Sequence, residues 1–175
     1  MKKFFVFLIY LFIVISLQAQ TNLFKGITSG ISEIEYLQYC SSHPDFTNMG
    51  ENYFTTTIEG RQYMIGSVFN KKNELTAILF VCFDSYEWME YDPNIKTNAL
   101  ELYSLLQIKY SNATYDEWLN WTDIPKGKAK TIAMFESQTI IALLSIREKN
   151  DMYTVNLSVG DTKYADPVIK NSGGF

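Results

Sequence analysis

The sequence predicts an α+β fold in which an antiparallel sheet is packed by two helices. Three observations support this prediction. Two stretches have the period of an amphipathic helix, six have the period of two that marks strands, and short turns separate neighbouring strands. The order is helix, three strands, helix, three strands. The chain is therefore expected to consist of tandem α-β-β-β units.

The longest predicted helix runs from Asp92 to Tyr110, near the middle of the chain. Asp92 can cap the first free N–H groups, and Pro93 suits the first helical position, where a missing donor costs nothing. One apolar stripe predicts packing against a sheet, and it consists of Ile95, Ala99, Leu102 and Leu106. Leu100 and Ile108 lie toward the polar side. Either the stripe is wider than one sheet contact or part of the back of the helix is covered.

A shorter helix of about ten residues is expected after Ser32, which can cap it, and it should end before Pro44. Alternation with a period of two predicts the six strands. Their ranges are 53–58, 61–69, 75–83, 128–136, 139–147 and 152–159. The third strand is apolar on both faces, which predicts a central strand covered at least in part on both sides. One six-stranded sheet and two three-stranded halves both fit this pattern.

The N-terminus has the pattern of an export signal. Lys2 and Lys3 precede an apolar run too short to span a bilayer, which predicts a signal peptide over residues 1–19 that is cleaved after Ala19. An uncleaved anchor is the alternative. Cleavage leaves one domain, 20–175, made of halves at about 20–91 and 92–165 with a short flexible C-terminal tail. The predicted location is the periplasm or the medium, with no membrane contact after cleavage.

The charge pattern excludes nucleic acid as an expected partner. The whole chain carries a net charge of −4, and loss of Lys2 and Lys3 with the signal makes the mature chain −6. Its basic residues form no stripe, whereas phosphate binding needs clustered positive charge.

The two cysteines, Cys40 and Cys82, could pair in an oxidising compartment and stabilise the fold by about 2 to 4 kcal/mol. The alternative to a disulfide is that both cysteines are buried free thiols. The sequence leaves this choice open, because it does not supply the Cα separation.

The sequence predicts no catalytic residue, no cofactor and no metal site. His43 is the single histidine, and no Gly-x-Ser-x-Gly motif exists for it to serve. Cys40 and His43 have ligand-like spacing, but a structural zinc site usually needs four protein ligands. Acidic residues are plentiful near the central helix, and two facing carboxylates could support glycan hydrolysis. The candidates for such a pair are Asp84, Glu90, Asp116 and Glu117.

The most informative feature is aromatic. All three tryptophans lie in the two segments that enter and leave the central helix, among acidic residues. Tryptophan and tyrosine are enriched at binding hot spots. The predicted partner-binding residues are Tyr115, Trp118, Trp121, Tyr86 and Tyr91. Such a surface would suit a basic protein or a carbohydrate ring. The alternative is that the tryptophans, Trp88 first among them, fold back to cover the sheet.

The chain resembles small exported proteins of Bacteroidetes whose folds are likened to the β-lactamase inhibitor protein. The residues that carry the resemblance are the Met1-Lys2-Lys3 signal ending Ala19-Gln20, Phe24-Lys25-Gly26-Ile27, Trp88, and Leu105-Leu106-Gln107-Ile108-Lys109-Tyr110. Ser111 stands where that pattern would have glycine. The resemblance implies tandem α-β-β-β units and export, but fold does not carry function with it.

These observations favour an exported, non-enzymatic module that binds or inhibits another protein. A periplasmic glycan hydrolase that depends on carboxylates is one alternative. A structural subunit of an envelope complex, which would complete a partner's sheet through an exposed edge, is another. The oligomeric state is left open.

Overall fold

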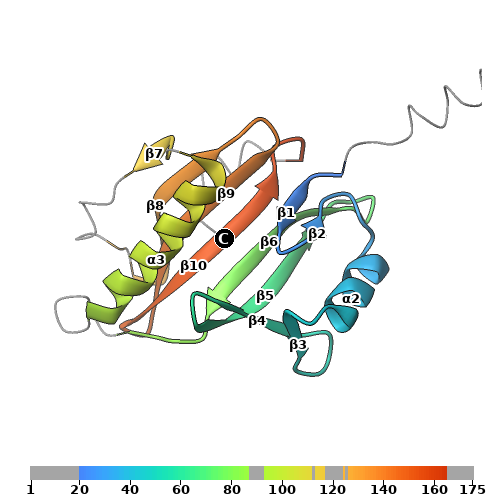
Figure 1. Ribbon diagram of the computed structural model, residues 1–175. Helices are drawn as coiled ribbons and strands as arrows, with labels where there is room; N and C mark the ends of the chain where they lie inside the picture. The colour runs from blue at the N-terminus through green and yellow to red at the C-terminus, as the bar shows by residue number, and fades with distance from the viewer. Residues whose placement is uncertain (1–19, 87–92, 112, 117–123, 125, 165–175) are drawn as a thin grey trace, which may run out of the picture.

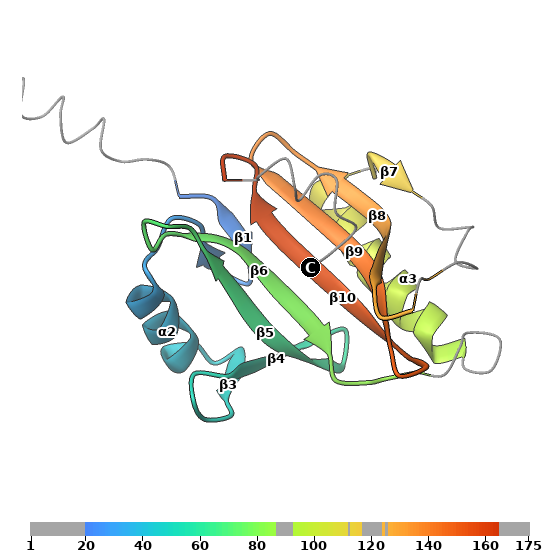
Figure 2. The same cartoon turned by 180° about the vertical axis from the view of Figure 1, so that it is seen from behind.

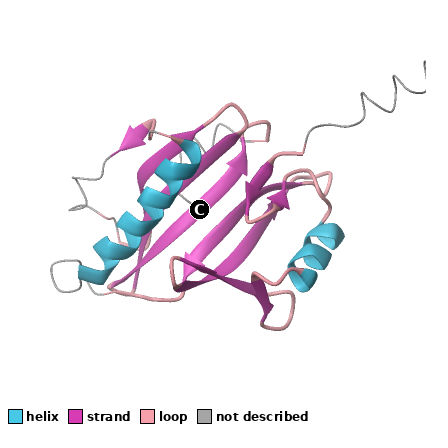
Figure 3. Cartoon of the chain, in the orientation of Figure 1, coloured by secondary structure: helices cyan, strands magenta, loops and turns pink. Residues whose placement is uncertain are grey.

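The computed structural model describes residues 20–86, 93–111, 113–116, 124 and 126–164. It contains helices α2 (Glu33–Ser42) and α3 (Pro93–Tyr110), a large sheet and a two-stranded sheet (Figures 1 and 3). The predicted α+β class is confirmed. The predicted signal peptide and the C-terminal tail lie outside the described residues.

The large sheet is antiparallel and continuous. Its eight strands lie in the order β3-β4-β5-β6-β10-β9-β8-β7. The strands in chain order are β1 (Asn22–Phe24), β2 (Ile27–Thr28), β3 (Phe46–Asn48), β4 (Phe54–Ile58), β5 (Arg61–Phe69), β6 (Leu75–Cys82), β7 (Tyr115–Asp116), β8 (Ala129–Glu136), β9 (Ile140–Lys149) and β10 (Met152–Asp161). Strand β6 pairs directly with β10, as Figure 2 shows, for example Phe80 with Leu157. Of the two sheet arrangements that fit the sequence, the single sheet is therefore correct.

All six predicted strands are present, and their ends lie within two residues of the predicted ones. Four further strands, β1, β2, β3 and β7, were not predicted. Each is two or three residues long, which is too short to show an alternating pattern.

Local sequence explains where α2 begins and ends. The Ser32 hydroxyl accepts from the Glu35 N–H, and the Glu35 carboxylate accepts from the Ser32 N–H at 2.8 Å, so a capping box forms. The Ser32 N–H and the Ser32 hydroxyl both donate to the Glu35 carboxylate, and these two hydrogen bonds lower the pKa of Glu35. At the other end, the His43 N–H donates to the Tyr39 carbonyl and makes the last hydrogen bond of the helix. The next residue is Pro44, which cannot continue a helix.

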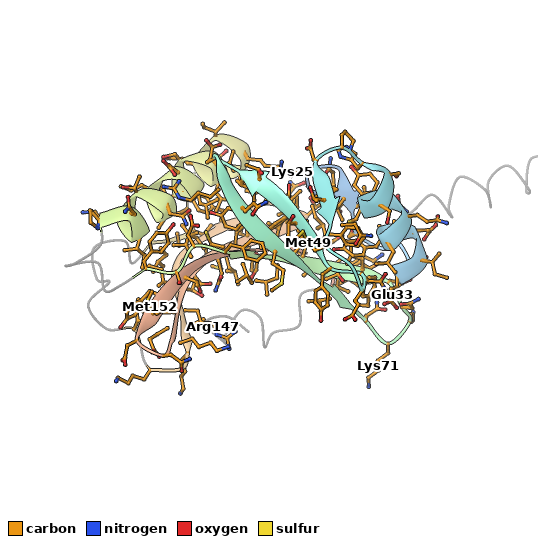
Figure 4. All side chains as sticks on the ribbon, turned by 90° about the horizontal axis from the view of Figure 1, so that it is seen from below. Lys25, Glu33, Met49, Lys71, Arg147 and Met152 are labelled. Atoms are coloured by element: carbon orange, nitrogen blue, oxygen red, sulfur yellow. The ribbon has the colours of Figure 1, made fainter. Side chains whose placement is uncertain are left out.

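Both helices pack on the same face of the sheet. Tyr36 of α2 contacts the rings of Phe54 and Phe69, while Tyr103 of α3 contacts Phe135, with centroids 5.3 Å apart. The strand register places all three phenylalanines on one face. The view from below agrees, because both helices lie on one side of the strands (Figure 4).

The β1–β2 hairpin fills the same face between the helices. Leu23 and Ile27 are fully buried there, and the Tyr110 hydroxyl of α3 donates to the Leu23 carbonyl at 2.9 Å. The Ser29 hydroxyl donates to the buried Asp161 carboxylate at 2.6 Å. The hairpin is therefore tied to both α3 and β10.

Strand β6 is central, as predicted, but its two faces differ. On the helix side Ile78 and Phe80 are fully buried. On the other side Leu79 and Val81 are only half-buried, and no described helix covers them. Within the described residues, β6 is therefore fully covered on the helix side and only partly covered on the other side.

The two cysteines are buried and do not form a disulfide. Cys82 accepts a hydrogen bond from the Asn98 amide at 3.3 Å, and Cys40 lies in α2. Of the two arrangements left open by the sequence, two buried free thiols are the one observed. Burial raises the pKa of the Cys40 thiol to about 11, so this thiol stays protonated at neutral pH.

We predict that neither thiol reacts with a water-soluble thiol reagent until the chain unfolds. The reaction should be slower in the native protein than in denaturant by about two orders of magnitude or more, because access requires opening of the core. A time course with and without guanidinium measures this difference. A peptide map that links Cys40 to Cys82 would contradict the prediction.

Candidate functional site

A groove runs along the solvent side of α3, where the β4–β5 turn forms one wall. It encloses about 340 Å³. The residues that line it are Glu59, Thr97, Leu100, Glu101, Ser104, Leu105 and Ile108. We call this feature the α3 groove. Two separate elements shape it, so its walls are held by the fold and not by one helix alone.

The α3 groove brings exposed apolar side chains together on the solvent side of α3. Ile95, Ala99, Leu102 and Leu106 are fully buried against the sheet, as predicted. On the opposite side Leu100 is 40% exposed and Ile108 is 86% exposed. No described element covers either of them. The sequence pattern that placed these two residues on the polar side therefore marked a real surface.

The wall across from α3 depends on a tight turn at Glu59 and Gly60. Both residues have positive φ, +48° for Glu59 and +76° for Gly60, as a two-residue hairpin turn requires. Glycine adopts this conformation without strain. The turn joins β4 to β5 and brings Glu59 to the edge of the groove.

An ion pair fixes this wall to the helix. Arg61, two residues after Glu59, pairs with Glu101 on α3 through its Nη1 atom, and its Nε atom lies 4.0 Å from Asp84. The Arg61 side chain is mostly buried, whereas Glu101 and Asp84 are more open to solvent. This ion pair holds the start of β5 against α3. It also neutralises Glu101, one of the two carboxylates named in the groove lining.

A buried polar network lies on the inner side of α3, centred on Asn98. The Tyr63 hydroxyl donates to Asn98 Oδ1 at 2.7 Å, and Asn98 Nδ2 donates to the Tyr86 hydroxyl at 3.1 Å and to Cys82 Sγ. Burial raises the pKa of both tyrosines, to about 12 for Tyr86, so both hydroxyls stay protonated at neutral pH and can donate. The network joins β5, β6 and α3, and so it fixes the helix that carries the groove.

Tyr86 was predicted to contact a partner, but the structure places it in the core. It is 5% exposed, and it pairs with Tyr153 of β10 in an isolated bridge. Its ring can lie in the core because Asn98 and Asp84 satisfy its hydroxyl. Tyr86 is therefore not part of the candidate contact surface.

The remaining predicted contact residues fall wholly or partly outside the described structure. Tyr91, Trp118 and Trp121 lie outside the described residues, as does Trp88. The backbone of Tyr115 pairs with Met134, which makes Tyr115 part of the sheet edge β7. The role of these four predicted contact residues stays a prediction.

The carboxylate pair considered for glycan hydrolysis stays an open alternative, because the side chains of three of its four candidates, Glu90, Asp116 and Glu117, are not described. Asp84 lies beside Arg61, and Glu90 and Glu117 are outside the described residues. His43 stacks on Tyr39, with ring centroids 5.0 Å apart, and its Nδ1 accepts from the Asp45 N–H. It is a loop histidine packed on an aromatic ring. Among the described residues, no three His, Cys, Asp or Glu side chains gather as metal ligands would.

A second hollow, of about 490 Å³, lies on the outer side of α2. Its lining comes from α2 alone, namely Ile34, Leu37, Gln38, Ser41 and Ser42. Ile34 is 69% exposed there. Because no second element of the described chain forms a wall, this surface is the weaker candidate. It does provide a matched control for experiments on α3.

In the described part of the chain, no helix has the length and apolar character needed to cross a bilayer. Comparison of the chain with protein-family models, with curated proteins and with solved structures found no match. The resemblance to exported inhibitor-like proteins therefore stays an expectation.

Proposed function

We propose that this chain is an exported, non-enzymatic module that binds another protein, and that the α3 groove is its contact surface. The observation that carries the proposal is the exposure of Ile108 and Leu100 in a groove walled by two elements. Exposed apolar patches rimmed by polar residues mark interaction sites. Burying one exposed isoleucine side chain contributes about 2 kcal/mol to binding.

The lining of the groove suits contact better than catalysis. Acid–base chemistry requires two groups whose pKa values are set apart. The ionisable groups in this lining are Glu59 and Glu101, and Glu101 is paired with Arg61. The other polar groups are the hydroxyls of Thr97 and Ser104, beside three apolar side chains.

A binding groove also fits better than a role in sheet completion. Within the described residues, the two edges of the large sheet are β3 and β7, which are three and two residues long there. Very short edge strands are a feature by which proteins discourage pairing with another chain. A partner is therefore expected at a side-chain surface.

The tryptophan-rich segments flank α3 in the chain. Residues 87–92 lead directly into Pro93, and residues 112–125 follow soon after Tyr110. We propose that Tyr91, Tyr115, Trp118 and Trp121 extend the contact made by the groove.

The test uses the mature chain, residues 20–175, as bait in an envelope extract, followed by an affinity measurement on each captured protein. Ile108→Asp should weaken binding of the specific partner by about 30-fold or more, because it places a carboxylate in an apolar contact. Ile34→Asp, a matched change on α2, should leave the affinity within twofold. Circular dichroism should show both variants folded.

Two results would overturn the assignment. One is a partner that binds Ile108→Asp as tightly as the unmodified chain. The other is a partner lost with Ile34→Asp and retained with Ile108→Asp, which would move the site to α2.

A further inference from the structure

This inference rests on the proposed function and specifies the partner. We infer that the α3 groove accepts an amphipathic α-helix with lysine or arginine on the flank that faces the β4–β5 turn. Three features of the groove support this choice: its shape, the backbone groups it does not offer, and the sign of its charges.

The shape follows from helical spacing. Leu100, Ser104 and Ile108 stand four residues apart on α3, so they form one row about 12 Å long. The small Ser104 side chain lies between two large apolar ones and leaves a depression. A leucine-sized side chain of a second helix can enter such a depression, as ridges of one helix pack into grooves of another. Two turns of a partner helix match the row in length.

The groove offers few backbone groups to an extended partner. Six of the seven described lining residues belong to α3, whose backbone groups are hydrogen-bonded within the helix. An extended peptide in this groove would bury N–H and C=O groups without partners. A helical partner satisfies its own backbone and presents only side chains.

The charges along the groove favour a partner with basic side chains. Among the described residues, the charged side chains that line the groove are two carboxylates, those of Glu59 and Glu101. Arg61 neutralises Glu101, whereas Glu59 is exposed at the tip of the turn across from the helix. A cation on the near flank of the partner would therefore meet Glu59. The acidic net charge of the mature chain also favours approach of a basic partner.

The probe is a displayed library of 18-residue peptides of unrestricted sequence, selected on the folded chain, residues 20–175. The selected peptides should have apolar residues at i, i+4 and i+7 and lysine or arginine on one flank. Ile108→Asp should weaken them at least tenfold. Glu59→Gln, which keeps the size of the side chain, should weaken them by about threefold at low salt. Because salt screens exposed charges, the Glu59 effect should vanish at 0.5 M NaCl.

Two matched controls lie on α2, where Glu33→Gln and Ile34→Asp should both leave the affinity unchanged. Failure of the inference and failure of the proposed function give different results. Peptides that need Ile108 but are acidic, or that contain proline and bind extended, overturn the inference alone. Failure to select any peptide, or peptides that bind Ile108→Asp as tightly as the unmodified chain, overturns both.

Discussion

Asn98→Leu is expected to lower the free energy of unfolding by about 3 kcal/mol, although leucine has a similar volume. Asn98 is 1% exposed, and its amide is the acceptor for Tyr63 and a donor to Tyr86. Leucine leaves the Tyr63 hydroxyl buried without its acceptor and removes the donor to Tyr86. Each group left unpaired costs about 1 to 3 kcal/mol. Chemical denaturation followed by circular dichroism measures the change.

A double substitution separates this mechanism from simple misfit. Removing both partners of a buried hydrogen bond costs less than removing one. Asn98→Leu combined with Tyr63→Phe should therefore be more stable than Asn98→Leu alone by about 1 kcal/mol. Thr97→Ala, an exposed change on the same helix, should shift stability by less than about 0.5 kcal/mol. A double variant less stable than the single one would reject the network as described.

Asp161→Ala is expected to destabilise the protein by about 2 to 3 kcal/mol and to loosen the β1–β2 hairpin first. The buried Asp161 carboxylate accepts from the Ser29 hydroxyl and, at 2.8 Å, from the Lys163 N–H. Its loss leaves the buried Ser29 hydroxyl without this acceptor. Hydrogen exchange of residues 22–28 should accelerate more than exchange within α3, because a local opening suffices.

A surface ion pair provides the matched control for Asp161. Asp45 lies 3.5 Å from Lys25, which is in the same hairpin region, but its side chain is 47% exposed. Exposed pairs contribute about 0 to 1 kcal/mol. Asp45→Ala should therefore have little effect on stability or exchange. Equal effects of the two substitutions would show that the hairpin is not held through Asp161.

Much of the fold could be predicted from the sequence because its elements carry strong local signals. The alternation from Arg61 to Phe69 predicted β5 with the observed bounds. Ser32 marked the cap of α2, and Pro93 marked the start of α3. Each of these signals acts within a few residues, so no knowledge of the tertiary structure was needed.

The joining of the halves could not be predicted, since it depends on contacts between distant residues. The pairing of Phe80 with Leu157 unites the sheet, yet both strands would show the same alternation in two separate sheets. The short strands were missed for a different reason. Phe46–Asn48 becomes β3 only because β4 lies beside it.

The candidate site was partly visible in the sequence. Leu100 and Ile108 stood out on the polar side of the helix, but their exposure depends on what the rest of the chain covers. Tyr86 shows the opposite case. Acidic neighbours made it resemble a surface residue, while Asn98, twelve residues away on the next helix, supplies the hydrogen bond that allows its burial.

The most direct test of binding through the α3 groove is a titration of residues 20–175, labelled at the isoleucine methyl groups, with the captured partner. Ile108 and Ile34 are both exposed in the free protein, at 86% and 69%. Their methyl signals therefore report separately on α3 and α2 in the same experiment. We expect the Ile108 signal to shift in proportion to saturation while the Ile34 signal stays in place. Saturation of the partner without any change at Ile108 would contradict the proposal.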